Sequence, residues 1–204
     1  MKHATLGVTL AAALWLVMFS PWTSPYINFW LLMSASAVIL TTYALLRGGI
    51  PFEGKPVPAK ALGGGLLIAV ALWGVFWIGN QVSQIIFPFA STQINTIYAM
   101  KGDASPFIVA LLLLFVIGPA EELFWRGYIQ KTFSLKYGRW GGFLAAWGCY
   151  TLIHVWSGNI MLLLAAATCG FFWGMLYLFF PKRLDAIVVS HALWDAAAFV
   201  IFPF

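Results

Sequence analysis

The sequence predicts an all-α protein, a polytopic transmembrane helical bundle with about seven spans. The first observation is composition: 62% of the 204 residues are hydrophobic and 8% are charged, whereas about 25% of a soluble domain is charged. The second is that apolar stretches of about 20 residues, the length that crosses a bilayer, recur along the chain. The third is that lysine and arginine gather between those stretches. Lipid is therefore the expected main solvent, and helices satisfy their own backbone groups there.

Seven apolar stretches follow one another in the order 5–22, 29–46, 62–88, 106–128, 141–157, 159–180 and 184–203. Glycine and proline punctuate the loop Arg47–Lys60, a second polar loop covers Ala90–Ser105, and Ser157-Gly158-Asn159 forms a short turn. The first stretch resembles a signal peptide but lacks an A-x-A-like cleavage site, so we expect a retained span. We expect one transmembrane domain over 1–204, with N-terminal spans in 1–105 and a catalytic core in 106–200.

The basic residues favour one orientation in the cell membrane. With seven spans, nine of the eleven lysines and arginines fall on one side: Lys2, Arg47, Lys55, Lys60, Lys131, Lys136, Arg139, Lys182 and Arg183. Lys101 falls on the other side. Positive residues stay in the cytoplasm, so the N-terminus is expected there and the C-terminus outside. The net charge of +5 does not indicate nucleic acid, because the sequence has no basic face.

Two adjacent glutamates lie in the fourth stretch, within Gly118-Pro-Ala-Glu-Glu-Leu-Phe-Trp-Arg126. A charge at membrane depth costs about 2.5–3.5 kcal/mol on insertion scales and usually marks a working site. Glu122 and Arg126 are four residues apart and share a helix face, whereas Glu121 is rotated by about 100°. Adjacent carboxylates in low dielectric resist ionising together, so Glu121 is the candidate base. The alternative is a Glu-Arg pair that only bridges helices.

The last three stretches add His154, His191 and Asp195. His191 and Asp195 are four residues apart on one face, so Asp195 can orient and charge-stabilise His191, or both can face a substrate. Each has a structural alternative: His154 as a hydrogen-bonded core histidine, and the other two as a local pair. Apart from Asp185 at a span edge, these residues and the two glutamates are the acidic and histidine residues of the spans. Together they indicate water-activating chemistry.

Peptide-bond hydrolysis needs an activated water and a group that stabilises charge on the carbonyl oxygen. Glu121 can take the proton, assisted by His154, and return it to the leaving amine, while His191 donates to the oxyanion. No serine or cysteine has an obvious basic partner, and Cys149 and Cys169 are expected to be packing thiols. The alternative is zinc held by Glu121, His154 and His191 with a free position for water. A reaction without metal or cofactor is favoured.

The three motifs are Glu-Glu-x-x-x-Arg, aromatic-x-x-x-His and His-x-x-x-Asn/Asp, in that order on successive membrane segments. This pattern, over about residues 106–200, resembles the CPBP family of CAAX prenyl proteases and bacteriocin-processing enzymes, also called Abi proteins. The resemblance implies an intramembrane endopeptidase.

Carried over by motif, the resemblance implies a role for each site residue. Glu121 and His154 would activate water, His191 and Asp195 would face the oxyanion, and Glu122 and Arg126 would support the site or orient substrate. Tyr150 stands where the family often has Phe, and Asp195 where it often has Asn. An ionised Asp cannot donate to an oxyanion, so Asp195 is either protonated or polarises His191.

The predicted function is cleavage of a membrane-associated peptide or protein, with the bilayer as the other partner and the site opening toward the cytoplasm. Substrate-binding residues, substrate identity and oligomeric state stay open. Two other functions remain: a catalytically silent membrane protein that binds a partner, such as a bacteriocin-immunity protein, or a transporter with a proton relay. In a protease the polar groups converge on one water, whereas a relay strings them along a pore.

Overall fold

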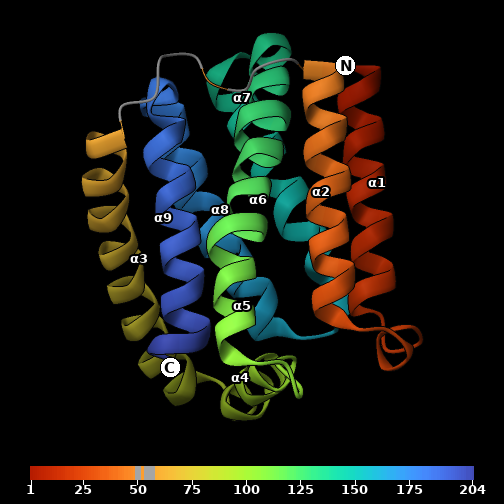
Figure 1. Cartoon of the computed structure of the whole chain (residues 1–204), viewed down its shortest axis with the longest axis vertical. Helices are drawn as coiled ribbons and strands as arrows, with labels where there is room; N and C mark the ends of the chain where they lie inside the picture. The colour runs from red at the N-terminus through yellow and green to blue at the C-terminus, as the bar shows by residue number, and fades with distance from the viewer. Residues whose placement is uncertain (49–51, 53–57) are drawn as a thin grey trace.

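The computed structural model describes residues 1–48, 52 and 58–204, and they form a helical bundle without strands (Figure 1). The α-helices are α1 Lys2–Phe19, α2 Phe29–Gly48, α3 Pro58–Ile86, α4 Ala90–Ala99, α5 Pro106–Leu112, α6 Gly118–Phe124, α7 Lys131–Leu152, α8 Ile160–Phe179 and α9 Leu184–Ala196. Shorter segments are the 3-10 turns η1 Ser24–Tyr26, η4 Ile153–Ser157 and η5 Pro181–Arg183, and the π-helical turns η2 Leu113–Ile117, η3 Trp125–Gln130 and η6 Ala197–Ile201. The all-α prediction is confirmed.

The described residues contain six helical runs that are long and apolar enough to cross a membrane, and one of them, Pro106–Ser157, has 52 residues. At 1.5 Å per residue it would span roughly 80 Å, more than twice a hydrocarbon core of about 30 Å. The chain reverses inside it at Gly138, whose φ of 73° and ψ of 166° are not helical. Glycine suits this position because it lacks the Cβ that disfavours positive φ.

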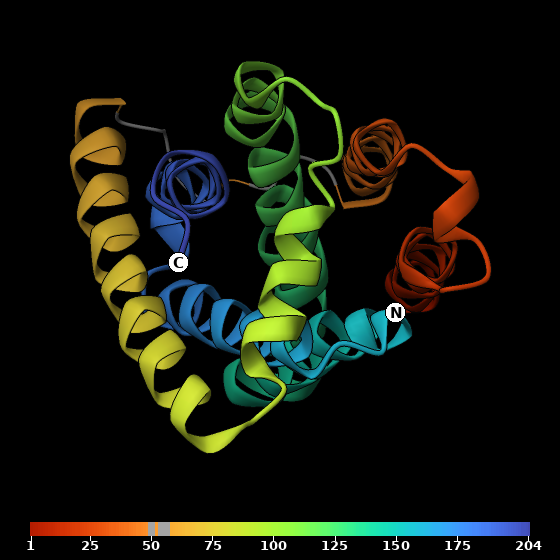
Figure 2. The same ribbon diagram turned by 90° about the horizontal axis from the view of Figure 1, so that it is seen from below.

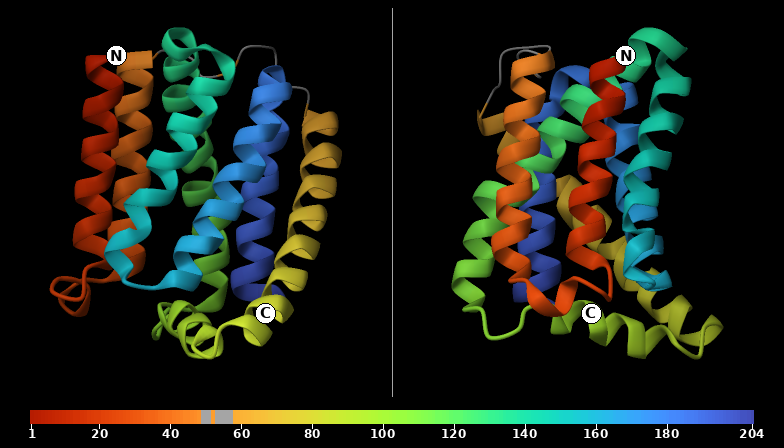
Figure 3. Two further views of the ribbon diagram at one scale, coloured as in Figure 1. Left: turned by 180° about the vertical axis from the view of Figure 1, so that it is seen from behind. Right: turned by 90° about the vertical axis from the view of Figure 1, so that its right-hand side faces the viewer.

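The two arms on either side of Gly138 run antiparallel (Figure 3). Gly142 packs so closely on Ser134 that a Cβ there would overlap its backbone, and the ring of Trp125 lies 5.4 Å from that of Tyr150. The residues in contact thus lie farther from Gly138 on both arms, from Ser134 with Gly142 to Trp125 with Tyr150, as in an antiparallel pair. The 52-residue run therefore supplies two crossings, and the described part of the chain accounts for the seven predicted spans.

The bundle has two distinct ends (Figure 1). The N-terminus, the reversal at Gly138 and the start of α9 lie at one end, which we call the basic end. The C-terminus and α4 lie at the other, which we call the C-terminal end. This agrees with an odd number of crossings. Most of the predicted loop Arg47–Lys60 lies outside the described residues, as does Lys55.

The predicted loop Ala90–Ser105 is not irregular throughout, because its first ten residues form α4. The short turn at Ser157–Asn159 is confirmed. Gly158 has a φ of 60°, and the side chain of Asn159 accepts a hydrogen bond from the backbone N–H of Leu162 at 2.9 Å, which caps α8.

Two groups of buried apolar side chains hold the helices together. The larger joins α1, α2, α7 and the segment 106–130 around Trp15, Phe124 and Trp125. The smaller joins α3, α8 and α9 around Trp173 and Ile187. α9 lies between α3 and α6 (Figures 1 and 2). Large apolar residues remain exposed on the outer faces of the helices, as expected for surfaces that contact lipid.

Candidate active site

Glu122 is the centre of a buried chain of charged groups. Its Oε1 accepts from Nη1 of Arg126 at 2.8 Å and lies 2.6 Å from Nδ1 of His191. The predicted i, i+4 pair with Arg126 is therefore formed, and it extends to α9. Arg126 also donates to the backbone carbonyl of Gly170 at 3.2 Å, which links the chain to α8. Glu122 is fully buried, so its charge depends on these partners.

His191 stands between two carboxylates. Its Nδ1 faces Glu122, and its Nε2 lies 3.3 Å from Oδ2 of Asp195. The predicted His191–Asp195 pair is thus present, and Asp195 is the more exposed partner. The indole of Trp173 stacks on the imidazole at a centroid distance of 3.8 Å, and its N–H donates to Ser190 at 2.9 Å. The imidazole is thereby fixed in both orientation and partners.

Glu121 points away from Glu122, as the helical rotation predicts. Its Oε2 accepts a hydrogen bond from the hydroxyl of Tyr150 at 3.0 Å, and the pair is buried. The sequence marked Tyr150 only as an aromatic position of a motif. Its hydroxyl is the one feature that distinguishes it from the more common Phe, and it contacts the candidate base.

His154 uses both ring nitrogens within the protein. Nδ1 lies 2.9 Å from the backbone carbonyl of Tyr150, and Nε2 lies 3.1 Å from the indole nitrogen of Trp15. An indole nitrogen is only a donor, so Nε2 accepts and Nδ1 carries the hydrogen. Trp15 is 139 residues away in sequence, and no pattern in the chain points to it. The expected contact between His154 and Glu121 is indirect, through Tyr150.

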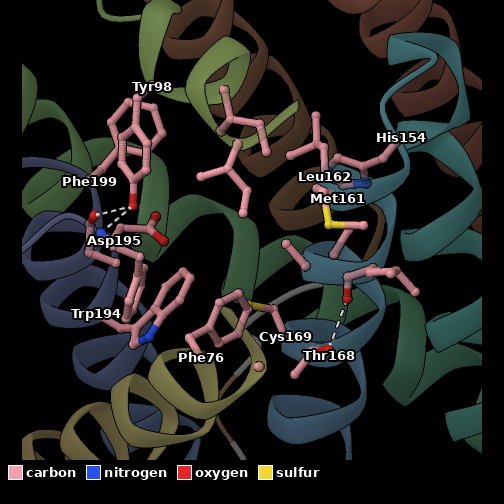
Figure 4. Close-up of a pocket in the computed structure, with 18 of the residues that line it drawn as sticks. Phe76, Tyr98, His154, Met161, Leu162, Thr168, Cys169, Trp194, Asp195 and Phe199 are labelled. Atoms are coloured by element: carbon pink, nitrogen blue, oxygen red, sulfur yellow. Dashed lines mark hydrogen bonds between the residues drawn. The ribbon is translucent and has the colours of Figure 1, made fainter. Parts of the chain in front are cut away.

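These side chains share one cavity of about 520 Å³. Glu121 from α6, Tyr150 from α7, His154 from η4, and His191 and Asp195 from α9 all line it. Figure 4 shows His154 and Asp195 on different sides of the cavity. Glu122 and Arg126 are not part of the lining and lie behind it. The structure thus brings four of the six predicted site residues to one surface and places the other two in support.

The zinc alternative does not fit the geometry. Among the described residues, no group of three His, Cys, Asp or Glu side chains is arranged to hold a metal ion. Glu121, His154 and His191 face the same cavity, but the nitrogens of both histidines already have partners in the protein. We derive no step through a metal.

The expectation that the site opens toward the basic end is wrong. The cavity is lined by residues from the other end, among them Phe19, Phe29, Tyr98 and Phe204, and it has no lysine or arginine in its lining. The reason is that His154 lies at the end of its span remote from Gly138. Bulky buried side chains such as Phe124 and Ile129 fill the basic half instead.

Fold and site together define a multi-pass helical membrane protein with a polar centre buried among its spans. Residues 103–197 match the family described as type II CAAX prenyl endopeptidase Rce1-like. The resemblance to the CAAX proteases is confirmed, and the match indicates a membrane endopeptidase of CAAX type. It includes every predicted site residue and leaves out α1 with Trp15. No curated protein and no solved structure matches the chain.

Proposed function

We propose that the protein is an intramembrane endopeptidase that hydrolyses a peptide bond in a membrane-associated substrate, using a water activated by Glu121. The observation that carries this proposal is convergence: Glu121, His154, His191 and Asp195 come from three segments and line one cavity. A proton relay would instead string such groups from one face to the other. The cavity lies toward one end, which supports hydrolysis over transport.

Glu121 is the proposed general base. The hydroxyl of Tyr150 holds Oε2 at 3.0 Å, which leaves Oε1 to accept a hydrogen bond from a water in the cavity. Glu121 takes a proton from this water as the oxygen attacks the carbonyl carbon. The C–N bond then breaks, and Glu121 returns the proton to the leaving amine. Its carboxylate is regenerated, so the cycle is balanced.

His191 is the proposed donor to the oxyanion. Glu122 holds Nδ1, and Arg126 balances the charge of Glu122. The contact from Nε2 to Asp195 is 3.3 Å, longer than the about 2.7–2.9 Å of a strong charge-assisted hydrogen bond. The Nε2–H, held in place by the fixed ring, can therefore also donate to a carbonyl oxygen that enters the cavity beside Asp195, as negative charge grows there. Asp195 acts as an acceptor that polarises His191, and it need not donate.

His154 is proposed as a positioning residue. Its Nδ1–H holds the carbonyl of Tyr150, and Tyr150 in turn holds Glu121. Because Nε2 accepts from Trp15, a water reaches that nitrogen only when the indole moves. The reaction needs no metal in this scheme, so a chelator should leave turnover unchanged.

Glu121→Gln provides the direct test. The purified protein is incubated in detergent with a membrane-peptide library, and products are read by mass spectrometry. The variant should lose all detectable turnover, because an amide cannot take the proton, while its melting temperature and peptide binding stay close to those of the wild type.

Glu122→Gln is the matched control for charge removal at the neighbouring position. It should mainly lower stability or weaken substrate positioning, because Arg126 and His191 lose the negative charge with which they pair. Wild-type turnover in Glu121→Gln would show that Glu121 is not the base. A wild-type protein that binds peptides but cleaves none would favour the silent binding protein.

A further inference from the structure

Positive charge is distributed unevenly between the two ends of the bundle. Eight basic residues in the described part of the chain belong to segments at the basic end: Lys2, Arg47, Lys60, Lys131, Lys136, Arg139, Lys182 and Arg183. Lys101 follows α4 at the C-terminal end. Short loops rich in lysine and arginine stay in the cytoplasm during insertion. This asymmetry places the C-terminal end of the bundle on the extracytoplasmic side.

The cavity occupies the half of the bundle with little positive charge. Its lining comes from the end of α1, the start of α2, the second half of α3, α4, the start of α8 and the C-terminal residues. These segments meet at the C-terminal end. The position of the cavity and the distribution of charge are independent observations. Both distinguish the C-terminal end of the bundle from the basic end.

We infer that the active-site cavity opens to the extracytoplasmic half of the membrane, and that its substrate is an apolar, membrane-anchored peptide whose scissile bond lies in the outer leaflet. This inference rests on the proposed function. A protease that trims cytoplasmic tails would need the opposite placement.

α4 lies across the C-terminal end of the bundle (Figures 1 and 2), and its residues Ile94, Ile97 and Tyr98 line the cavity there. At one end of α4, the side-chain oxygen of Gln93 accepts from the backbone N–H of Met161 at 3.0 Å. The backbone carbonyl of Gln93 accepts from the side-chain amide of Asn159 at 2.9 Å. At the other end, the hydroxyl of Tyr98 donates to the carbonyl of Ala198 at 3.1 Å. α4 is thus fastened to both α8 and the C-terminal segment.

One lateral wall of the cavity consists of exposed apolar side chains. Val82 and Ile86 of α3 and Leu164 of α8 line the cavity, and they are also 46%, 59% and 45% exposed. We place the lateral entrance beside these exposed apolar side chains, between α3 and α8. With α4 across the C-terminal end, an anchored peptide reaches Glu121 by lateral movement from the outer leaflet. The apolar lining favours aliphatic or aromatic chains beside the scissile bond.

Sidedness is measured first without any substrate. Single cysteines replace the exposed Thr92 on α4 and Lys136 at the basic end, in a Cys149→Ala/Cys169→Ala background. Intact cells are treated with a small membrane-impermeant thiol reagent. Thr92→Cys should label, and Lys136→Cys should label only after permeabilisation. The reverse pattern would overturn the inference.

Turnover is then compared in sealed vesicles of both orientations. The best library peptide from the detergent assay carries a charged tag that prevents crossing. Right-side-out vesicles should cleave it, and inside-out vesicles should lack activity until detergent is added. Cleavage by sealed inside-out vesicles alone would refute the inference but not the proposed function. Failure in detergent with the expected labelling would refute the proposed function and leave the outward opening standing.

Discussion

At the residue scale, Glu121 and Glu122 are neighbours in sequence with opposite surroundings. Glu122 has two cationic or protonatable partners on one oxygen, whereas Glu121 has a phenolic hydroxyl and the cavity. Glu122 is thus held by ionic partners, whereas Glu121 faces the cavity, where the proposed reaction takes place. The same division applies to His191, whose Nδ1 is held firmly and whose Nε2 has a longer contact.

Asp195 allows a test of how His191 is polarised. Asp195→Ala removes the acceptor for Nε2, and a hydrogen bond to a charged group is worth about 1.5–3 kcal/mol. Loss of this order should lower kcat by about tenfold to a hundredfold. Asp195→Asn keeps an acceptor oxygen and should retain most of the turnover. Both are measured in the peptide assay, with Asp103→Ala as an exposed control.

Equal kcat for wild type and Asp195→Ala would contradict the polarising role. A loss in Asp195→Asn as severe as that in Asp195→Ala would show instead that the negative charge itself is required.

At the element scale, α6 lies between two π-helical turns, η2 and η3, a feature often found at functional sites. Close approach of α6 to α9 brings Glu122 to His191. The approach depends on Gly118, where a Cβ would lie 2.8 Å from the backbone Cα of Ala192. Small residues allow such contact between membrane helices, and the backbone of α9 cannot yield as a flexible side chain would.

Gly118→Ala should therefore separate α6 from α9, lengthen the Glu122–His191 contact and abolish most turnover. It should also lower the melting temperature in detergent. Gly148→Ala is the matched control, because a Cβ there meets nothing within 4 Å. An Ala in a helix interior is favoured over Gly by about 0.5–1 kcal/mol, so the control should be neutral or slightly stabilised. Full activity in Gly118→Ala would show that this close approach is dispensable.

At the scale of the whole molecule, the site extends beyond the segment that matches the family. α1 lies outside residues 103–197, yet Trp15 donates to His154, and the ring of Phe19 lies 5.9 Å from the same imidazole. α1 therefore contributes side chains to the candidate active site.

Trp15→Phe tests this dependence, because it keeps an aromatic ring and removes the N–H donor. Leaving Nε2 of His154 buried without its donor should cost about 1–3 kcal/mol, seen as a lower melting temperature. Turnover should fall as His154 loses its orientation. Trp22→Phe, at a position 78% exposed, is the control and should behave as wild type. Unchanged stability and turnover in Trp15→Phe would show that the site does not depend on the hydrogen bond from α1.

The sequence by itself determined the helical membrane architecture, the order of the spans, the resemblance that residues 103–197 bear to the CAAX proteases, and the two i, i+4 pairs, Glu122–Arg126 and His191–Asp195. The physical reason is local. A bilayer requires backbone hydrogen bonds within each segment, so apolar length identifies a helix, and helical periodicity identifies which neighbours share a face. The helical run Pro106–Ser157 is continuous across Gly138. The apolar stretches 106–128 and 141–157 nevertheless predicted two separate spans there.

The tertiary structure alone decided which partners meet across helices and which end the cavity faces. Trp15 with His154, Tyr150 with Glu121, and Glu122 with His191 are 139, 29 and 69 residues apart, and their contacts depend on helix rotation and close packing. The expectation of a site at the basic end failed for the same reason. Loop charge reports the orientation of the spans in a membrane, whereas the position of a cavity depends on where side chains of different helices leave space between them.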